Sequence, residues 1–183
     1  MERLSVLLLF GVSLFLTVIA CASSDGSKQE LTQNDLRNQQ AVTECLKSEI
    51  NENRKASAKQ FFLLGIKYRQ RATKDGNWGP VAKAFGESAV LYPRPLALKE
   101  YAEASLKSQS KALLKKSLEE QMELLNQTID LYRSVIAADS ILCELSKDQR
   151  VELDQYLNCI EFYMQGGKPS IPCMPLQRLG LDK

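Results

Sequence analysis

Histidine is absent from the 183-residue chain. Its absence excludes Ser-His-Asp and Cys-His nucleophile pairs, zinc sites with imidazole ligands, and acid–base catalysis by imidazole. Also missing are the G-x-S-x-G turn, phosphate-binding loops, the G-x-G-x-x-G turn and any Cys-x-x-Cys pair. Carboxylates one helical turn apart, such as Glu119 and Glu123, are typical of a solvated helix face. The sequence therefore predicts no catalytic site, metal site or cofactor, and a protein that is not an enzyme.

A strong net charge is lacking as well, because 24 basic side chains face 22 acidic ones. A dedicated nucleic-acid binder would carry a strongly basic stripe, so nucleic acid is not expected as a partner. The charges are nevertheless unevenly placed: residues 54–74 contain basic side chains and no acid, whereas residues 139–161 are mainly acidic. The basic stretch could meet an acidic partner or anionic lipid, and the alternative is that both stretches are solvated outer faces.

The chain has one long apolar run, from Leu4 to Ile19. This run is shorter than the roughly 20 residues of a membrane-spanning helix and is typical of a signal peptide. It ends in Val18-Ile19-Ala20-Cys21, which resembles the lipobox of bacterial lipoproteins. The alternatives are an ordinary signal peptide cleaved near Ala20 or Ala22, with Cys21 incidental, and an uncleaved anchor.

The lipoprotein resemblance implies removal of residues 1–20 and acylation of Cys21, including a palmitate-type chain. Several acyl chains anchor a protein stably without spanning the bilayer. The polar residues 22–34 are predicted to be a flexible tether. With Ala22 after the cysteine, enterobacterial-type sorting would place the protein at the outer membrane, facing the periplasm.

The other four cysteines are an even number in a compartment that permits disulfides. Cys159 and Cys173 flank a chain reversal at residues 166–169, so we expect them to pair and hold the C-terminal tail. Cys45 with Cys143 follows only by elimination. The alternative is that some of these residues are buried free thiols.

No alternating strand pattern occurs, and apolar residues recur at helical spacing, so the predicted fold class is all-α. We expect antiparallel helical hairpins in a domain at 35–166, followed by a tail at 167–183. The expected helices, about six, cover residues 35–51, 55–73, 80–91, 95–108, 111–138 and 146–166. Gly76 is expected to end the second helix, Pro80 to begin the third, and Ser146 to open the last one with a capping box.

The second and third expected helices resemble one tetratricopeptide repeat, whose pattern is W-x2-L-G-x2-Y, then A-x3-F, then P. The residues that carry this resemblance are Phe61, Leu64, Gly65, Tyr68, Phe85 and Pro93. The turn around Trp78 is about four residues longer than the pattern allows, and Val81 replaces its alanine. A generic helical hairpin that shares these residues by chance is the alternative.

The resemblance implies a right-handed helical stack whose concave surface includes Phe62, Ile66, Arg69 and Gln70. Phe62 and Ile66 stand where a carboxylate clamp needs Lys and Asn, so an apolar groove for a partner helix or extended segment is expected. The predicted function is a membrane-anchored scaffold that binds another envelope protein. The alternatives are an accessory subunit of a cell-envelope enzyme and, less favoured, a carboxylate-dependent enzyme. A lone repeat also suggests a homo-oligomer, since such repeats stack.

Overall fold

The computed structural model describes residues 31–113, 115–168, 173–179 and 181. The expected signal peptide, Cys21 and most of the expected tether lie outside these residues. Within them the chain forms seven α-helices and one short 3-10 helix and has no strand, so the predicted all-α fold class is confirmed. The compact unit begins at Leu31, inside the range predicted as the tether, because the Leu31 side chain is buried in the core.

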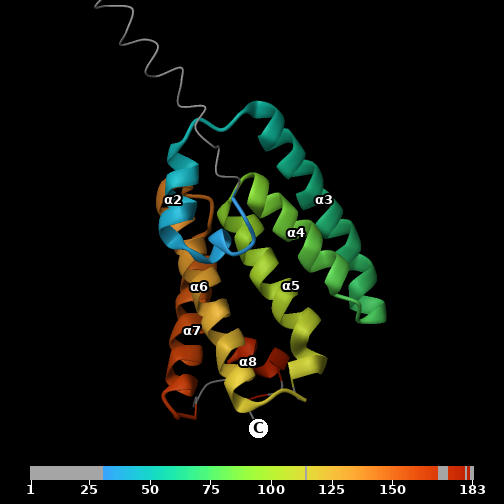
Figure 1. Ribbon diagram of the computed structural model, residues 1–183, viewed down its shortest axis with the longest axis vertical. Helices are drawn as coiled ribbons and strands as arrows, with labels where there is room; N and C mark the ends of the chain where they lie inside the picture. Colours follow the sequence, from blue (N-terminus) through green and yellow to red (C-terminus); the bar gives the residue numbers. More distant parts are fainter. Residues whose placement is uncertain (1–30, 114, 169–172, 180, 182–183) are drawn as a thin grey trace, which may run out of the picture. The chain divides into compact units, whose positions relative to one another are not determined.

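The helices follow one another as packed neighbours (Figure 1). Their bounds are Asp35–Arg37 for η1, Gln39–Lys47 for α2, Glu52–Asp75 for α3, Gly79–Leu91 for α4, Pro95–Leu113 for α5, Leu118–Leu142 for α6, Lys147–Met164 for α7 and Met174–Leu179 for α8. Each helix from α3 to α7 packs on the next one; α2 covers α6, and α8 packs against α5 and α7. Figure 1 shows α3 at one side of the unit, α7 at the other, and α4 and α5 between them.

Local chemistry sets several helix ends as expected. Gly76 ends α3 in the left-handed conformation with φ 74°, and Pro80 lies in the first turn of α4. The capping box of α7 is present: Ser146 Oγ accepts from the Gln149 N–H, and the Gln149 side chain accepts from the Ser146 N–H. These three predictions are confirmed.

The predicted helix bounds differ most from the structure at two places in the chain. The helix expected at 35–51 is divided, because Asn38 leaves the helical conformation and its side chain caps α2. The helix expected at 111–138 begins at Leu118, where Ser117 and Glu120 form a second capping box. In both places a polar cap interrupts an apolar pattern that continues through it.

The core consists of one large cluster between α2, α5, α6, α7 and α8, and a smaller one between α3, α4 and α5. Helix α6 contributes Leu125, Ile129 and Tyr132 to the large cluster. Leu118, the first residue of the same helix, remains 70% exposed. The buried stripe therefore covers the middle of α6.

The crossing of α3 and α4 depends on Gly65. A Cβ atom at this position would lie 2.6 Å from Cε1 of Phe85, whose ring is completely buried. The Phe62 ring packs at an angle of 59° against the same phenylalanine, with centroids 5.3 Å apart. A residue without a side chain is thus required for the two helices to come this close.

We predict that Gly65→Ala lowers the free energy of unfolding by about 1–2 kcal/mol, because overpacking against Phe85 exceeds the roughly 1 kcal/mol by which alanine favours a helix over glycine. Urea denaturation followed by circular dichroism measures the change. Gly79→Ala is the matched control, since its Cβ would meet only Asn77 Oδ1 at 3.7 Å. Equal stability of the Gly65→Ala variant and the natural chain would contradict the prediction.

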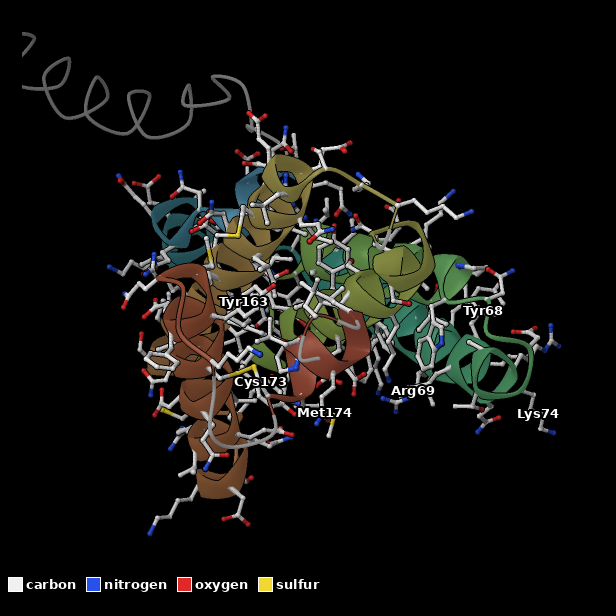
Figure 2. All side chains as sticks on the ribbon, turned by 90° about the horizontal axis from the view of Figure 1, so that it is seen from below. Tyr68, Arg69, Lys74, Tyr163, Cys173 and Met174 are labelled. Carbon is white, nitrogen blue, oxygen red and sulfur yellow. A yellow bond between two sulfur atoms is a disulfide. The ribbon has the colours of Figure 1, made fainter. Side chains whose placement is uncertain are left out.

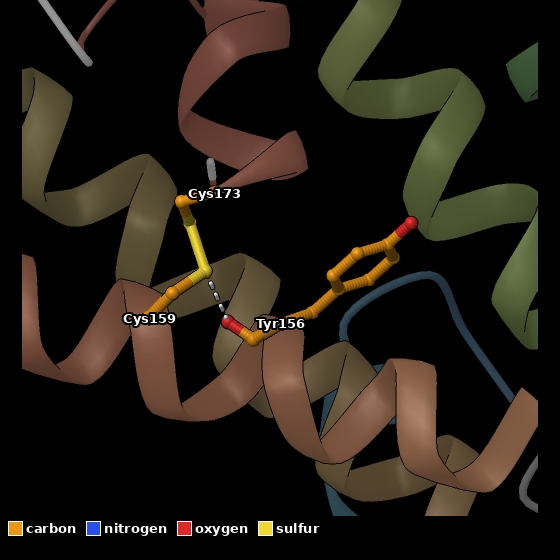
Figure 3. Close-up of a disulfide and its surroundings, with 3 residues drawn as sticks. All are labelled: Tyr156, Cys159 and Cys173. Atoms are coloured by element: carbon orange, nitrogen blue, oxygen red, sulfur yellow. Dashed lines mark hydrogen bonds between the residues drawn. A yellow bond between two sulfur atoms is a disulfide. The ribbon is translucent and has the colours of Figure 1, made fainter. Parts of the chain in front are cut away.

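The C-terminal tail is held by a disulfide between Cys159 of α7 and Cys173, which directly precedes α8 (Figure 3). The predicted pairing is confirmed. Helix α8 was not expected from the sequence, and its Leu176 and Leu179 are buried in the large cluster. The tail therefore contributes to the core in addition to being tied to it.

The pairing of Cys45 with Cys143 is wrong, because both are free thiols in the structure. Cys45 lies in the last turns of α2, half-buried against the large cluster, and burial raises the pKa of its thiol, an effect that the charge of Arg54 partly offsets. Cys143 is exposed at the end of α6, in the left-handed conformation with φ 52°. Elimination uses no geometry, whereas a disulfide needs two Cα atoms within about 7 Å.

Within the part of the chain that the structure describes, no helix combines the length and the apolarity needed to cross a membrane.

Candidate functional site

A cavity of about 280 Å³ lies between α3 and the start of α5. The α3 side supplies Lys55, Ala58, Lys59 and Phe62. The other lining residues are Ser88, Tyr92, Arg94, Ala97 and Glu144, which come from α4, the α4–α5 joint, the first turn of α5 and the α6–α7 loop. The cavity is therefore built by three separate stretches of the sequence: residues 55–62, residues 88–97 and Glu144.

The floor of the cavity is held by hydrogen bonds between neighbouring helices. Ser88 Oγ donates to the Ala58 carbonyl oxygen across 2.8 Å, which ties α4 to α3. One turn earlier on α3, Arg54 Nη2 donates to the Val90 carbonyl oxygen at 3.1 Å. The spacing of α3 and α4 at the cavity is thus set by side chain to backbone contacts as well as by apolar packing.

Charged groups dominate the rim. Lys55 Nζ lies 2.7 Å from Glu52 Oε1 and 5.8 Å from the centroid of the Tyr92 ring. On the opposite side Arg94 Nε donates to Glu144 Oε1 at 2.6 Å. Lys59 is exposed. Three cations and one acid thus line the cavity.

Asp139 of α6 positions the loop that carries Glu144. Its backbone oxygen accepts from the Cys143 N–H at 2.8 Å, and its carboxylate accepts from the Leu145 N–H at 2.8 Å and from Arg150 Nε at 2.6 Å. Burial acts to raise the pKa of Asp139, but the hydrogen bonds, chiefly that of Arg150, outweigh it and hold the pKa below the ordinary value of 3.8. The carboxylate is therefore a charged acceptor at neutral pH.

The four residues predicted for a groove share one side of α3 but have different environments. Phe62 lines the cavity, and Ile66 packs against the smaller cluster. Arg69 is paired with Glu100 of α5 at 2.6 Å, and its guanidinium carbon lies 6.0 Å from the centroid of the Phe85 ring. Gln70 is exposed. The cavity therefore overlaps the predicted groove only at Phe62.

The ion pair of Arg69 with Glu100 crosses from α3 to α5 beyond Phe62. Figure 2 shows Arg69 with Tyr68 and Lys74 at the α3 edge of the unit, and Cys173 and Met174 where α8 meets α7. Because the ion pair bridges the two helices there, the open space lies toward their N-terminal ends. The site is thus displaced from the predicted groove toward the start of α3.

The sequence analysis did not single out Lys55, Lys59, Arg94 or Glu144 as a site. Two of them belong to the basic stretch 54–74, and Glu144 belongs to the acidic stretch 139–161. The uneven charge was therefore the available signal, and only the fold shows that these stretches meet at one cavity.

No protein-family model, curated protein or solved structure matches the chain. Among the residues that the structure describes, no group of three or more Cys, Asp or Glu side chains is placed to hold a metal ion.

Proposed function

We propose that this protein is a lipid-anchored lipoprotein of the bacterial cell envelope whose helical domain binds another envelope protein and holds it near the membrane. The observation that carries the proposal is the open cavity between α3 and α5, which combines an apolar wall with unevenly distributed charge. Such a surface suits recognition of a partner segment.

A second apolar residue supports a binding surface along this side of α3. Leu63, one turn beyond Lys59, is 55% exposed, although leucine is usually buried. Residues four apart lie on the same helix face, so Leu63 extends the rim of the cavity. A partner that enters the cavity would cover the side chains of Phe62 and Leu63.

The N-terminal part of the proposal rests on the resemblance of residues 18–21 to a lipobox. Acylation at Cys21 would anchor the chain, because each buried methylene contributes about 0.8 kcal/mol and two or more chains suffice for stable binding. Residues 22–30 would then separate the membrane surface from the helical unit, which begins at Leu31. We place the protein at the outer membrane, facing the periplasm.

Site-specific crosslinking in intact cells tests the proposed binding role. A photocrosslinking amino acid is introduced at position 59, on the cavity, and in a control chain at position 115, an exposed lysine between α5 and α6. We expect one discrete crosslinked protein from position 59 and none from position 115. The same products from both positions, or none from either, would refute the binding role.

Fractionation of cells that produce the Cys21→Ser variant tests the anchor. Loss of the acylated cysteine removes the proposed anchor, so the variant should move from the membrane pellet to the soluble fraction once residues 1–20 have been removed. Unchanged sedimentation of the variant that lacks residues 1–20 would exclude a lipid anchor at Cys21.

A further inference from the structure

The cavity carries cationic groups that are only partly paired with acidic groups of the domain. Among the described residues none pairs with Lys59 Nζ, and only the Nε atom of Arg94 is engaged, with Glu144. The partner of Lys55 is Glu52, whose side chain is 84% exposed. Low-dielectric walls concentrate the field of such charges, so the cavity attracts anionic groups.

The same cavity has an apolar wall and limited room. Ala58, Phe62 and Ala97 face it, which favours an aliphatic group beside the anion. Its volume of about 280 Å³ corresponds to roughly nine water molecules at about 30 Å³ each. That space accommodates one or two amino-acid side chains with their backbone and is too small for a large cofactor.

Glu144 adds a requirement for a hydrogen-bond donor. Its Oε1 atom is paired with Arg94, whereas Oε2 is buried and receives no hydrogen bond from any described residue. A buried carboxylate oxygen is stabilised by a donor, so the occupant should bring an N–H or O–H group. A polypeptide brings a backbone N–H at every residue except proline.

We propose that the cavity binds an acidic, extended segment of the partner protein. An Asp or Glu side chain of the segment meets Lys59 and the outer nitrogens of Arg94, and an adjacent aliphatic side chain contacts Phe62. The Glu144 carboxylate, whose side chain is 20% exposed, turns so that its Oε2 atom accepts a backbone N–H of the segment. This inference rests on the proposed binding function and names the chemistry of the partner. The cavity offers positive charge and an apolar wall, and a segment with an acidic and an aliphatic side chain complements both.

Selection from a phage-displayed library of random peptides tests the inference, with the full chain immobilised in detergent. We expect the enriched peptides to contain Asp or Glu next to an aliphatic residue. The Lys55→Glu/Lys59→Glu variant should bind these peptides about tenfold or more weakly, because attraction becomes repulsion, and should itself select basic peptides. Lys115→Glu/Lys116→Glu, the same charge change at exposed positions between α5 and α6, is the control and should bind like the natural chain.

A second measurement does not depend on how the variants fold. The affinity of the natural chain for the enriched peptides, measured by fluorescence anisotropy, should fall steadily with added salt, because exposed charge pairs are screened. No enrichment, enrichment without acidic residues, or equal binding by the charge-reversed variant would overturn the inference. Displacement of the peptides by phosphatidylglycerol micelles but not by phosphatidylcholine micelles would assign the cavity to an anionic lipid instead.

The outcomes separate this inference from the proposed function. A protein crosslinked at position 59 without selection of acidic peptides would leave the scaffold in place and reject the acidic segment. Selection of acidic peptides without any crosslinked protein in cells would support the acidic specificity of the cavity and reject the envelope scaffold.

Discussion

Replacing Cys159 and Cys173 by serine should lower the free energy of unfolding by about 3 kcal/mol, because the disulfide closes a loop with a sequence separation of 14 residues. In the chain-entropy interpretation the crosslink restricts the unfolded chain more than it strengthens the folded one. The measurement is urea denaturation of the natural chain and the double variant, with and without reductant.

The local effect should be larger at α8 than elsewhere. This helix has six residues, too few to be stable alone, and its position depends on the disulfide and on burial of Leu176 and Leu179. Hydrogen exchange of the α8 amides should therefore accelerate in the variant more than that of the α6 amides. Addition of reductant should destabilise the natural chain and leave the double variant unchanged.

Cys143→Ser provides the control for the disulfide, because Cys143 is a free and exposed thiol. This substitution should change stability by no more than about 0.5 kcal/mol. If the variant that lacks Cys159 and Cys173 denatures at the same urea concentration as the natural chain, the disulfide does not stabilise the tail and the buried leucines hold it alone.

The helix ends that the sequence predicted correctly depend on contacts within a few residues. Gly76 ends α3 because glycine adopts positive φ without strain, and Ser146 begins α7 through a bond to an N–H three residues later. Such signals are readable because the interacting groups are almost adjacent in the chain.

The same kind of signal was present at Ser117 and Glu120, yet the predicted helix ran through it. Apolar residues continue at helical spacing on both sides of this capping box, and periodicity alone does not show that the chain has changed direction. Helix α8 was missed for a different reason. It has only six residues, which are too few to show a helical period of apolar residues. Its burial depends on α5 and α7, which are distant in the sequence.

The candidate site was only partly predictable, because it is formed by tertiary packing. Phe62 was identified through a family resemblance, and it lines the cavity. The pair of Arg94 and Glu144 joins residues 50 positions apart, and nothing in one sequence shows that these two charges meet. Gly65 and Phe85, two residues of the resemblance, meet where α3 and α4 cross, but membership of the tetratricopeptide family stays a prediction.

Asp139→Ala should lower the free energy of unfolding at neutral pH by about 2–3 kcal/mol, because its carboxylate accepts two hydrogen bonds, one of them from a guanidinium. Asp139 is 6% exposed, so water does not replace these contacts in the folded chain. The Asp139→Asn variant keeps an acceptor for the Leu145 N–H, so its free energy of unfolding should fall by less. Asp154→Ala, at an exposed position of α7, should change stability by no more than about 0.5 kcal/mol.

Lowering the pH should reduce the difference in free energy of unfolding between the natural chain and the Asp139→Ala variant. The pKa of Asp139 is lower in the folded chain than its ordinary value of 3.8, so its contribution is complete above that value and is lost as the pH falls through the folded pKa. Urea denaturation at neutral pH and near pH 2 should therefore show a large gap between the natural chain and Asp139→Ala that narrows in acid. A gap that stays constant would mean that the carboxylate charge does not hold the loop.

Because that loop carries Glu144 to the cavity, Asp139→Asn should also weaken binding of the selected acidic peptides at neutral pH, although Asp139 is not among the residues that line the cavity.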